Sequence, residues 1–490
     1  MFDNLENQED IGKAEFKARV LAIRTELILT QQRLRNSEKS FPVIFVFAGV
    51  DGAGKHETVD VLNDWMDARW METHAYTKPT EEERMRPEFW RYWRDIPQNG
   101  EISLCLSAWY SRPLLNYVKK GHSKGTFKRD IVEINEFEKT LKANRTLILK
   151  FWMHLDKKKQ LDRLEYLSKN ALTSWQVKSD DWENVGLYED FIKGSIKLIE
   201  KCDEVPWTII NGANENSRQL EVAETFIKQV NKQLDIYENA EKPQKVAIAP
   251  FGSGHDRLGE LDLKQSLKGK LYDEKLAELQ ADLFSLSQKA HRKQRSIILV
   301  FEGADAAGKG GCIKRISRAL DARQYDVQSI AAPTKEELAH HYLWRFWNEI
   351  PLDGRIKIFD RSWYGRLLVE RIEGFATDVE WQQAFDEIND FEGDLQAHGC
   401  IILKFWLQVG KDEQYNRFKE RETIPYKKWK LTDEDWRNRD RWDDYQIVIN
   451  DVLDLCHTKV HPWHPIASNC KKYARIEVLE TLVNRLKNDL

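Results

Sequence analysis

The chain has 490 residues, with 76 Lys and Arg against 80 Asp and Glu and a formal net charge of −4. At roughly 100 to 200 residues per domain this length predicts two or more domains, and 41 % hydrophobic residues with 18 tryptophans exclude global disorder. The balanced charge argues against nucleic acid or an anionic membrane as the main partner, because such binders carry a large positive excess.

The N-terminal residues and the cysteines indicate the compartment. The first residues are acidic and polar, and no stretch approaches the ~20 apolar residues that a membrane span needs. The six cysteines include no CxxC pair, so neither a zinc site nor a disulfide framework is indicated. We therefore expect a soluble, cytoplasmic protein with reduced thiols.

Each half of the chain begins with a charged helical segment followed by a short apolar run. The runs Val43–Phe47 and Ser296–Phe301 have the length and β-branched content of a buried strand, and a glycine-containing turn and a helical pattern follow each. Further runs, at Arg355–Phe359 and Cys400–Trp406, alternate with helical stretches. Alternating strands and helices predict an α/β fold with a parallel sheet covered by helices on both faces.

Tryptophans that recur at a fixed spacing show that the two halves are copies of one domain. The spacing is 254 residues, and Lys55 and Lys309 share it. The pairs are Trp90 and Trp344, Trp93 and Trp347, Trp109 and Trp363, Trp152 and Trp406, Trp175 and Trp429, and Trp182 and Trp436. We place the copies at residues 1–240 and 257–490, and the Pro- and Gly-containing stretch 241–256 reads as a linker.

The turn after the first strand has the form GxxxxGK in both copies, at Gly49–Lys55 and Gly303–Lys309. In this motif glycines let backbone N–H groups face phosphate oxygens, the next helix adds the positive end of its dipole, and the lysine reaches the outer phosphates. We therefore predict a phosphate-binding loop in each copy. The predicted phosphate-binding residues of the second loop are Gly303, Ala304, Ala306, Ala307, Gly308, Lys309 and Gly310.

Both loops lack the Ser or Thr that normally follows the lysine and binds Mg²⁺. His56 and Gly310 stand at that position, so another oxygen ligand is needed. Asp51 and Asp305, inside the loops, are the candidates, because Mg²⁺ prefers one or two carboxylates with water and phosphate oxygens. A turn-forming role for Asp305 is the alternative.

The two copies differ at the end of a later strand. In the second copy an apolar run ends in Asp360 and Arg361, as a Walker B strand does, whereas the first copy has Leu106 and Ser107 at this register. Beside the phosphate loop, Asp360 would hold Mg²⁺ while Arg361 offsets phosphoryl charge. The predicted catalytic residues are Asp305, Lys309, Asp360 and Arg361, and the predicted metal ligands are Asp305 and Asp360.

A basic segment distinguishes the second copy as well. Residues 417–441 carry nine basic and six acidic side chains, against three basic and four acidic in the matching window 163–187. A charge run is usually a solvated face, but these basic residues occur in the copy that also has Asp360 and Arg361. Phosphoryl transfer needs several cations to stabilise negative charge, so we interpret the segment as a phosphate-facing lid.

Taken together, these motifs resemble polyphosphate kinase family 2. The residues that carry the resemblance are Glu302–Gly311, Phe359–Tyr364, Val369–Arg371, Lys427–Lys430, Arg441–Tyr445, Pro462, Trp463, Lys471, Lys472 and Arg475. The tandem arrangement is similar to the fused two-domain branch, the polyphosphate:AMP phosphotransferases. The resemblance implies two tandem P-loop kinase-like domains with helical lids, and Mg²⁺-dependent transfer of phosphate from polyphosphate to AMP.

The resemblance also implies phosphate or nucleotide contacts for a set of basic residues. They are Arg366, Arg371, Arg417, Arg421, Lys427, Lys428 and Lys430. A row of cations suits a linear polyanion because each cation meets a repeating charge. Cys470 stands where the family commonly has Asp, so the contribution of the terminal segment is left open.

Two other functions are compatible with the phosphate loops. An ATP-dependent nucleoside monophosphate kinase shares the loop, the metal and the lid, and a non-catalytic phosphate sensor would bind phosphate in both copies. The sequence leaves open whether AMP or GMP is the acceptor, and which direction of the reaction is preferred. We expect the first copy to be non-catalytic and to replace the partner subunit of a dimeric single-domain relative, as an internal pseudo-dimer. Further homo-oligomerisation is left open.

Overall fold

The computed structural model describes residues 1–490 except 3–4, 6–9, 120–123, 241–246 and 426–430. The described chain forms two compact units. Unit 1 comprises Met1–Pro79, Arg91–Lys242 and Lys335–Trp344, and unit 2 comprises Thr80–Trp90, Pro243–Thr334 and Arg345–Leu490. Each unit thus includes a short stretch of the other sequence copy. The domain boundaries drawn from the sequence stay a prediction.

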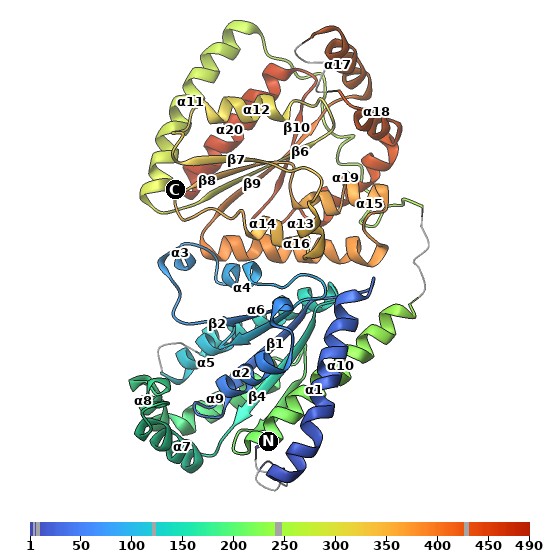
Figure 1. Ribbon diagram of the computed structural model, residues 1–490. Coiled ribbons are helices and arrows are strands. Elements are labelled where there is room, and N and C mark those ends of the chain that lie inside the picture. The colour runs from blue at the N-terminus through green and yellow to red at the C-terminus, as the bar shows by residue number, and fades with distance from the viewer. Residues whose placement is uncertain (3–4, 6–9, 120–123, 241–246, 426–430) are drawn as a thin grey trace. The chain divides into compact units, whose positions relative to one another are not determined.

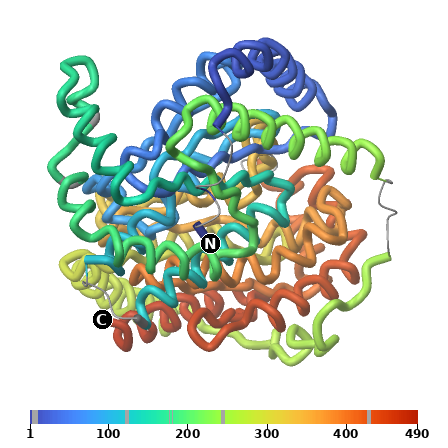
Figure 2. Tube along the Cα trace, turned by 90° about the horizontal axis from the view of Figure 1, so that it is seen from below, coloured from blue at the N-terminus to red at the C-terminus, as the bar shows by residue number. Residues whose placement is uncertain are grey.

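Unit 1 contains a five-stranded parallel sheet with the strand order β2-β3-β1-β4-β5 (Figure 1). The strands are β1 (Val43–Gly49), β2 (Met71–Ala75), β3 (Ile102–Leu106), β4 (Leu147–His154) and β5 (Trp207–Asn211). The helices are α1 (Lys13–Asn36), α2 (Lys55–Trp65), α4 (Trp90–Arg94), α5 (Ser111–Val118), α6 (Lys124–Ala143), α7 (Lys157–Lys169), α8 (Ser179–Gly186), α9 (Tyr188–Lys201), α10 (Glu215–Glu238) and α13 (Lys335–Ala339). In Figures 1 and 2, α1 and α10 lie side by side.

Unit 2 repeats this architecture with the order β10-β9-β6-β8-β7. The strands are β6 (Ile297–Gly303), β7 (Tyr325–Ser329), β8 (Ile356–Asp360), β9 (Ile401–Gln408) and β10 (Trp463–Ala467). The helices are α3 (Glu81–Arg84), α11 (Gly269–Arg292), α12 (Lys309–Ser317), α14 (Trp344–Trp347), α15 (Val369–Glu373), α16 (Asp378–His398), α17 (Lys411–Thr423), α18 (Asp433–Asp440), α19 (Trp442–Leu455) and α20 (Lys471–Asp489), with a 3-10 turn, η4, at Trp363–Arg366.

The strand that precedes the phosphate loop is central in both sheets. In unit 2, Ile297 at the start of β6 is aligned with Ile356 of β8 and with Ile401 of β9. All strands are parallel, so their carboxyl ends meet at one edge of the sheet, which is where open α/β sheets bind ligands. The phosphate loop and Asp360 lie at this edge. The prediction of an α/β fold with two tandem parallel sheets is confirmed.

Buried strands and flanking helices form the core of each unit. Every residue of β9 is buried, as expected for a strand covered on both faces. Helices α11, α12 and α20 share one hydrophobic core with the unit 2 sheet, and α1, α2 and α10 do the same in unit 1. These helices therefore hold the phosphate loop between the sheet and the last helix of the unit.

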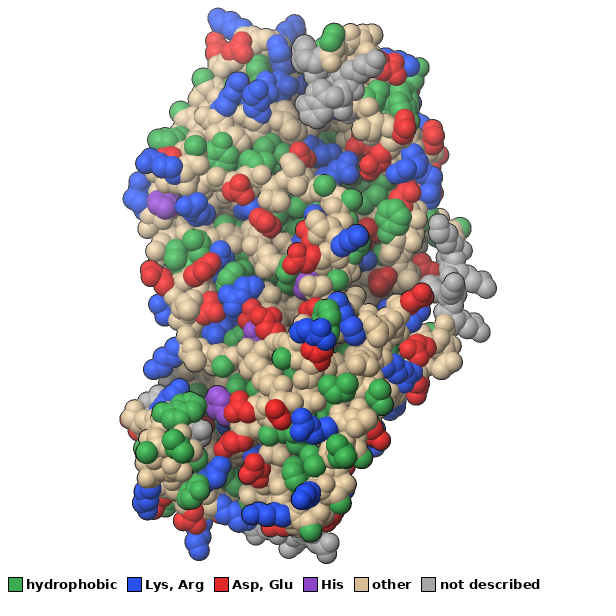
Figure 3. Space-filling view, in the orientation of Figure 1, with side chains coloured by type: hydrophobic (Ala, Val, Ile, Leu, Met, Phe, Trp, Pro, Cys, Tyr) green, Lys and Arg blue, Asp and Glu red, His purple; other side chains and the backbone are tan. Residues whose placement is uncertain are grey.

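The surface carries charges of both signs. On the face shown in Figure 3, Lys and Arg side chains are interspersed with Asp and Glu side chains, in keeping with a net charge of −4. Among the residues that the structure describes, no helix is both long enough and apolar enough to cross a membrane.

Candidate active site

The phosphate loop of unit 2 joins β6 to α12 and needs glycine at both ends. Gly303 has a φ of 146°, and a Cβ atom there would lie 2.5 Å from the carbonyl oxygen of Leu407. Gly308, at the N-cap of α12, is left-handed with a φ of 114°. Glycine adopts both conformations without steric cost, so the motif spacing follows from the backbone path. Lys309 Nζ donates to the carbonyl oxygen of Gly303 at 2.7 Å.

Asp360 and Arg361 lie beside this loop, at the end of β8. Asp360 is the last residue of the strand and is aligned with Phe301, two residues before the loop. Arg361 has a φ of 66°, which is uncommon for a residue with a Cβ atom. Its Nη2 lies 3.1 Å from Asp305 Oδ1. The structure therefore brings the predicted Walker B residues to the phosphate loop.

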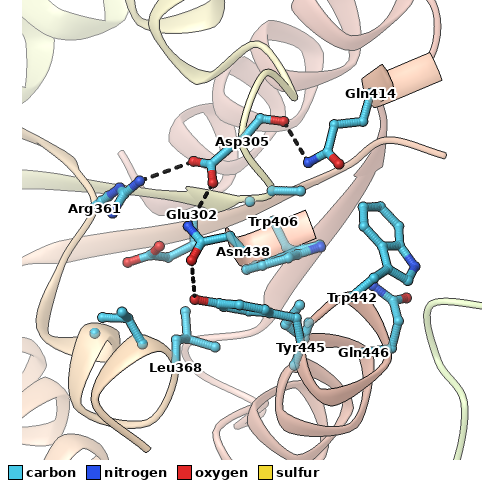
Figure 4. Close-up of a pocket in the computed structure, with 15 residues that line it drawn as sticks. Glu302, Asp305, Arg361, Leu368, Trp406, Gln414, Asn438, Trp442, Tyr445 and Gln446 are labelled. Carbon is cyan, nitrogen blue, oxygen red and sulfur yellow. Dashed lines mark hydrogen bonds and ion pairs between the residues drawn. The ribbon is translucent and has the colours of Figure 1, made fainter. Parts of the chain in front are cut away.

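Asp305 links the loop to the helices that follow β9. Its carboxylate accepts a hydrogen bond from Asn438 Nδ2 of α18 at 2.8 Å, and its carbonyl oxygen accepts one from Gln414 Nε2 of α17 at 3.0 Å. Tyr445 of α19 donates to Asn438 Oδ1 at 3.3 Å. Figure 4 shows these side chains gathered around Asp305. The segment predicted to be a lid is thus hydrogen-bonded to the loop.

Glu302 and Ser362 belong to this site, although the sequence motifs predicted no role for either side chain. Ser362 Oγ donates to Glu302 Oε1 at 2.8 Å, and both side chains are buried. Burial raises the pKa of Glu302, and the positive charge of Lys309 opposes that rise. The first copy has Ala48 and Ala108 at the matching positions. This paired loss at the repeat offset is the signal that could have revealed them.

The charges around the loop are held in fixed states by their neighbours. Burial disfavours the cation of Arg361, but the carboxylates of Asp305 and Glu302 outweigh this effect and raise its pKa. Burial and the charge of Asp305 raise the pKa of the Tyr445 phenol. Arg361 therefore stays a cation, and Tyr445 stays a hydrogen-bond donor to Asn438.

The carboxylates at this edge suit a hard divalent cation. Mg²⁺ binds through one or two carboxylates and keeps water and phosphate oxygens as its other ligands. Asp305 and Asp360 offer that donor set. In the described parts of the chain no cluster of three or more His, Cys, Asp or Glu side chains forms a closed metal site of the structural zinc kind. The residues present fit Mg²⁺, and its ligands stay a prediction.

A cavity with aromatic walls opens on the first half of the loop. It is lined by residues 302–305 and by Arg361, and its aromatic side chains are Trp406, Trp442 and Tyr445 (Figure 4). Pockets of this kind, mostly apolar with a few polar groups, are typical of sites for small organic ligands. We call it the aromatic cavity.

A second cavity opens on the other half of the loop. It has a volume of about 280 Å³ and is lined by residues 306–308 and by the start of α12. Four of its side chains are basic, Arg417, Arg421, Lys471 and Arg475, and Glu420 is the acidic one among its described residues. We call it the basic cavity. One phosphate loop therefore separates an aromatic cavity from a basic one.

Among the other predicted basic residues, Arg421 and Arg366 each lie close to a carboxylate. Arg421 lines the basic cavity, and its Nη1 lies 3.8 Å from Asp435 Oδ1. Arg366 forms an ion pair with Glu370 at 3.0 Å, one helical turn further along. Lys427, Lys428 and Lys430 lie outside the described residues.

Arg417, a predicted phosphate contact, lines the basic cavity and is bound to acceptors of the protein itself. The residue is 3 % exposed, and each of its five N–H groups has an acceptor. Nε donates to Glu413 at 2.7 Å, and Nη1 donates to the carbonyl oxygens of residues 306–307 at 2.9 and 3.1 Å. Nη2 donates to those of residues 468–469 at 2.6 and 2.8 Å. Arg417 therefore braces the loop backbone, and its contact with phosphate stays a prediction.

Arg371, predicted to contact phosphate or nucleotide, is also bound to acceptors of the protein, and its predicted contact stays a prediction. Arg371 is buried, and it donates to Asp451 Oδ2 and to the carbonyl oxygen of Ala249, both at 2.8 Å. Its guanidinium lies 3.8 Å from the ring centroid of Trp381. The backbone N–H of Phe251 donates to the same Asp451 at 3.0 Å. Arg371 thus anchors the segment that precedes the second copy, and a carboxylate already neutralises its charge.

Unit 1 keeps the loop and its first polar contacts but not the strand-end chemistry. Lys55 Nζ donates to the carbonyl oxygen of Gly49 at 2.9 Å, as its counterpart does in unit 2. Asn184 Nδ2 donates to Asp51 Oδ2 at 2.9 Å. At the end of β3, however, residues 106–107 are Leu and Ser. A leucine side chain cannot coordinate a metal ion, and serine carries no charge to offset phosphate.

A buried ion pair holds the turn after β8, and unit 1 has the same pair. Lys404 Nζ of β9 donates to Glu392 Oε2 of α16 at 2.7 Å and to the Tyr364 hydroxyl at 2.9 Å. In unit 1, Lys150 donates to Glu138 at 2.9 Å. These charges are essentially without solvent contact, so each needs its partner. The pairs fix the framework of the turn in both units.

Comparison with known proteins agrees with this geometry. Residues 10–238 and 266–490 both match the family model of polyphosphate kinase 2 (PPK2). The chain belongs to the polyphosphate kinase 2 family. The two matched stretches correspond to the two sequence copies, so the resemblance to a two-domain PPK2 is confirmed.

Two relatives of similar length match this chain almost from end to end. The polyphosphate:AMP phosphotransferase of Pseudomonas aeruginosa is 42 % identical over 488 residues, which cover 98 % of each chain. That of Pseudomonas syringae pv. tomato is 38 % identical over 490 residues, covering 99 % of this chain and 98 % of the other. A crystal structure of a polyphosphate kinase 2 from P. aeruginosa has a TM-score of 0.89 at 39 % identity, covering 100 % of this chain and 99 % of that one.

Proposed function

We propose that this chain is a polyphosphate:AMP phosphotransferase, in which unit 2 transfers a phosphoryl group from inorganic polyphosphate to AMP. The observation that carries the proposal is the placement of an aromatic and a basic cavity on adjoining stretches of one phosphate loop. The names of the full-length relatives support polyphosphate as donor and AMP as acceptor.

In this proposal the donor lies in the basic cavity. Polyphosphate is a linear polyanion, and the side chains of Arg421, Lys471 and Arg475 give it successive cations. The N-termini of α12 and α20 begin at Lys309 and Lys471, and each adds the positive end of a helix dipole. The end of the polyphosphate chain then reaches the loop backbone. The basic cavity needs no base-specific contacts, because polyphosphate has no base.

The acceptor occupies the aromatic cavity. Trp442 and Tyr445 offer flat faces for a nucleobase, and Arg361 lines the same cavity with a fixed positive charge. This places the nucleotide phosphate beside Arg361 and across the loop from the donor. The two substrates therefore approach the loop from adjoining sides.

The reaction needs positioning and charge stabilisation more than covalent chemistry by the protein. An oxygen of the AMP phosphate attacks the terminal phosphorus of polyphosphate, the bond to the bridging oxygen breaks, and the shortened chain leaves with that oxygen. Lys309 and Arg361 stabilise the negative charge that spreads over the transferred group. Mg²⁺ held by Asp305 and Asp360 would neutralise further phosphate charge.

Unit 1 has no place in this chemistry. It lacks the carboxylate and the guanidinium at its strand end, and Ala48 and Ala108 replace the buried Glu and Ser. We therefore propose that unit 1 supports unit 2 as the second half of an internal pseudo-dimer and does not turn over substrate.

The test is an assay of purified protein with AMP, Mg²⁺ and polyphosphate in the absence of ATP. We expect ADP to form at a rate that depends on both substrates, with no ADP when polyphosphate is left out. A parallel assay with ATP as donor addresses the competing nucleoside monophosphate kinase. If ADP forms with ATP but not with polyphosphate, polyphosphate is rejected as the donor. If both substrates bind and no ADP forms with either donor, the protein is a sensor.

A further inference from the structure

The last helix of each unit reaches the phosphate loop with its first turn. Helix α10 begins four residues after β5 and α20 begins four residues after β10, so the two helices are equivalent position by position. The fourth residue is Arg218 in α10 and Ala474 in α20. A long cation and a methyl group thus occupy the same place in the two units.

Arg218 fills the space next to the phosphate loop of unit 1. Its guanidinium lies against Gly54, so that a Cβ atom placed on this glycine would overlap it. Arg218 Nε donates to Thr58 Oγ1 at 2.9 Å, and Nη1 donates to the carbonyl oxygen of Gly212 at 2.7 Å. The residue is only 3 % exposed. The cation is therefore buried, hydrogen-bonded and held in the place of a ligand.

The equivalent space in unit 2 is the basic cavity. Ala474 lines it, together with Gly308 and Cys312, which are the counterparts of Gly54 and Thr58. A Cβ atom on Gly308 would meet no described atom within 4 Å. Cysteine in place of threonine also removes the hydroxyl that binds Arg218 in unit 1. Unit 2, whose cavity is open, thus lacks both the arginine and the hydroxyl group that would accept its hydrogen bond.

The two units also differ in the basic side chains at these positions. Unit 2 has Arg421, Lys471 and Arg475 around the cavity, and the matching positions of unit 1 are Leu167, Glu215 and Gln219. Unit 1 has also gained Glu57, whose Oε1 lies 2.7 Å from Arg163 Nη2. Unit 1 therefore lacks these three cations, its remaining Arg163 is paired with Glu57, and Arg218 supplies an internal cation.

We propose that the fourth residue of the last helix decides whether a unit admits a polyphosphate chain: Ala474 keeps the cavity of unit 2 open, and Arg218 plugs that of unit 1. The inference rests on the proposed function, because it takes polyphosphate to be the ligand of the basic cavity. A chain entering unit 1 would have to displace a buried guanidinium and leave Thr58 Oγ1 and Gly212 without their donor.

The test is a size series at position 474, namely Ala474→Ser, Ala474→Leu and the double variant Ala474→Arg with Cys312→Thr, which copies unit 1. We expect the KM for polyphosphate to rise with the size of the side chain, least in the serine variant and at least about tenfold in the leucine variant, and we expect the arginine variant to abolish tripolyphosphate binding in calorimetry. Binding of AMP, which lies in the other cavity, should stay within about threefold.

Arg218→Ala is the matched control. Arg218 is outside the catalytic unit, so this variant should keep the wild-type KM values and kcat within about twofold. An unchanged KM for polyphosphate in the leucine variant would overturn the inference, and so would tripolyphosphate binding to an arginine variant that binds AMP normally. If the arginine variant fails to bind AMP, the leucine variant decides alone. Wild-type protein without polyphosphate-dependent activity would instead reject the proposed function, so the two failures are distinguishable.

Discussion

The ends of β3 and β8 show which parts of this domain serve the fold and which serve chemistry. Ser107 and Arg361 share a left-handed backbone, with φ of 55° and 66°. Both turns are also held by a buried ion pair, Lys150 with Glu138 in unit 1 and Lys404 with Glu392 in unit 2. Both units therefore have the turn, although the side chains at its reactive positions differ. What persists in both units is scaffold, and what differs is the candidate machinery for phosphoryl transfer.

Copying the strand end of unit 1 into unit 2 should have the largest effect. Asp360→Leu reproduces the residue found at position 106, and we expect kcat with polyphosphate and AMP to fall about 10³-fold, because the proposed Mg²⁺ site would lose a carboxylate where negative charge develops. The measurement is ADP formation at saturating substrates, with thermal unfolding to check the fold. The reciprocal change, Leu106→Asp, should add no activity. More than a tenth of the wild-type rate in Asp360→Leu would contradict the assignment.

Breaking the two buried ion pairs separates stability from catalysis. Lys404→Met and Lys150→Met each leave a buried carboxylate unpaired, and each should cost about 3–5 kcal/mol of unfolding free energy. Only Lys404→Met releases the turn that carries Arg361, so only this variant should lower kcat, by on the order of 10-fold. Assays at a temperature at which both variants stay folded give the comparison. Equal losses of kcat would mean that the pairs act through global stability alone.

Acid should weaken unit 2 through a histidine that unit 1 lacks. Burial and the charge of Lys404 lower the pKa of His461 to about 4, and Val205 takes its place in unit 1. Below pH 6.5 the unfolded chain binds a proton that the folded state excludes. Stability is therefore complete above pH 6.5 and falls as the pH drops toward about 4.

The check is the melting temperature at pH 7 and at pH 5, with unfolding monitored by tryptophan fluorescence. His461→Val should remove part of the decrease in melting temperature between pH 7 and pH 5, on the order of 5 °C. His255, which is exposed, is the control position, and His255→Val should change this decrease little. An equally large decrease in His461→Val would show that other groups govern the acid response.

Local patterns were enough to predict the fold class, the duplication and both phosphate loops. The GxxxxGK motif, the apolar run that ends in Asp360 and the 254-residue offset each depend on neighbours in sequence or on direct comparison of the copies. The same comparison, applied to every position, would also have found Glu302 and Ser362. What it cannot supply is the environment of a charged side chain.

The protein contacts of Arg417 and Arg371 could not be predicted because their partners are distant in the sequence. Arg417 was assigned to a lid by charge, yet its guanidinium is used up by carbonyl groups 51 and 52 residues away as well as by the loop. Arg371 meets its carboxylate 80 residues along the chain. The plug formed by Arg218 depends on a contact across 160 residues. Sequence shows that these residues are basic, but only tertiary packing shows that they are buried.

The central claim is that unit 2 alone transfers phosphate, and the two loop lysines test it most directly. Lys309→Ala and Lys55→Ala remove the same side chain from the same motif, so any difference reports the unit and not the substitution. With polyphosphate and AMP at saturation, we predict that Lys309→Ala loses about 10³-fold in kcat and that Lys55→Ala keeps at least about half of it. Comparable losses in the two variants, or a larger loss in Lys55→Ala, would contradict the account.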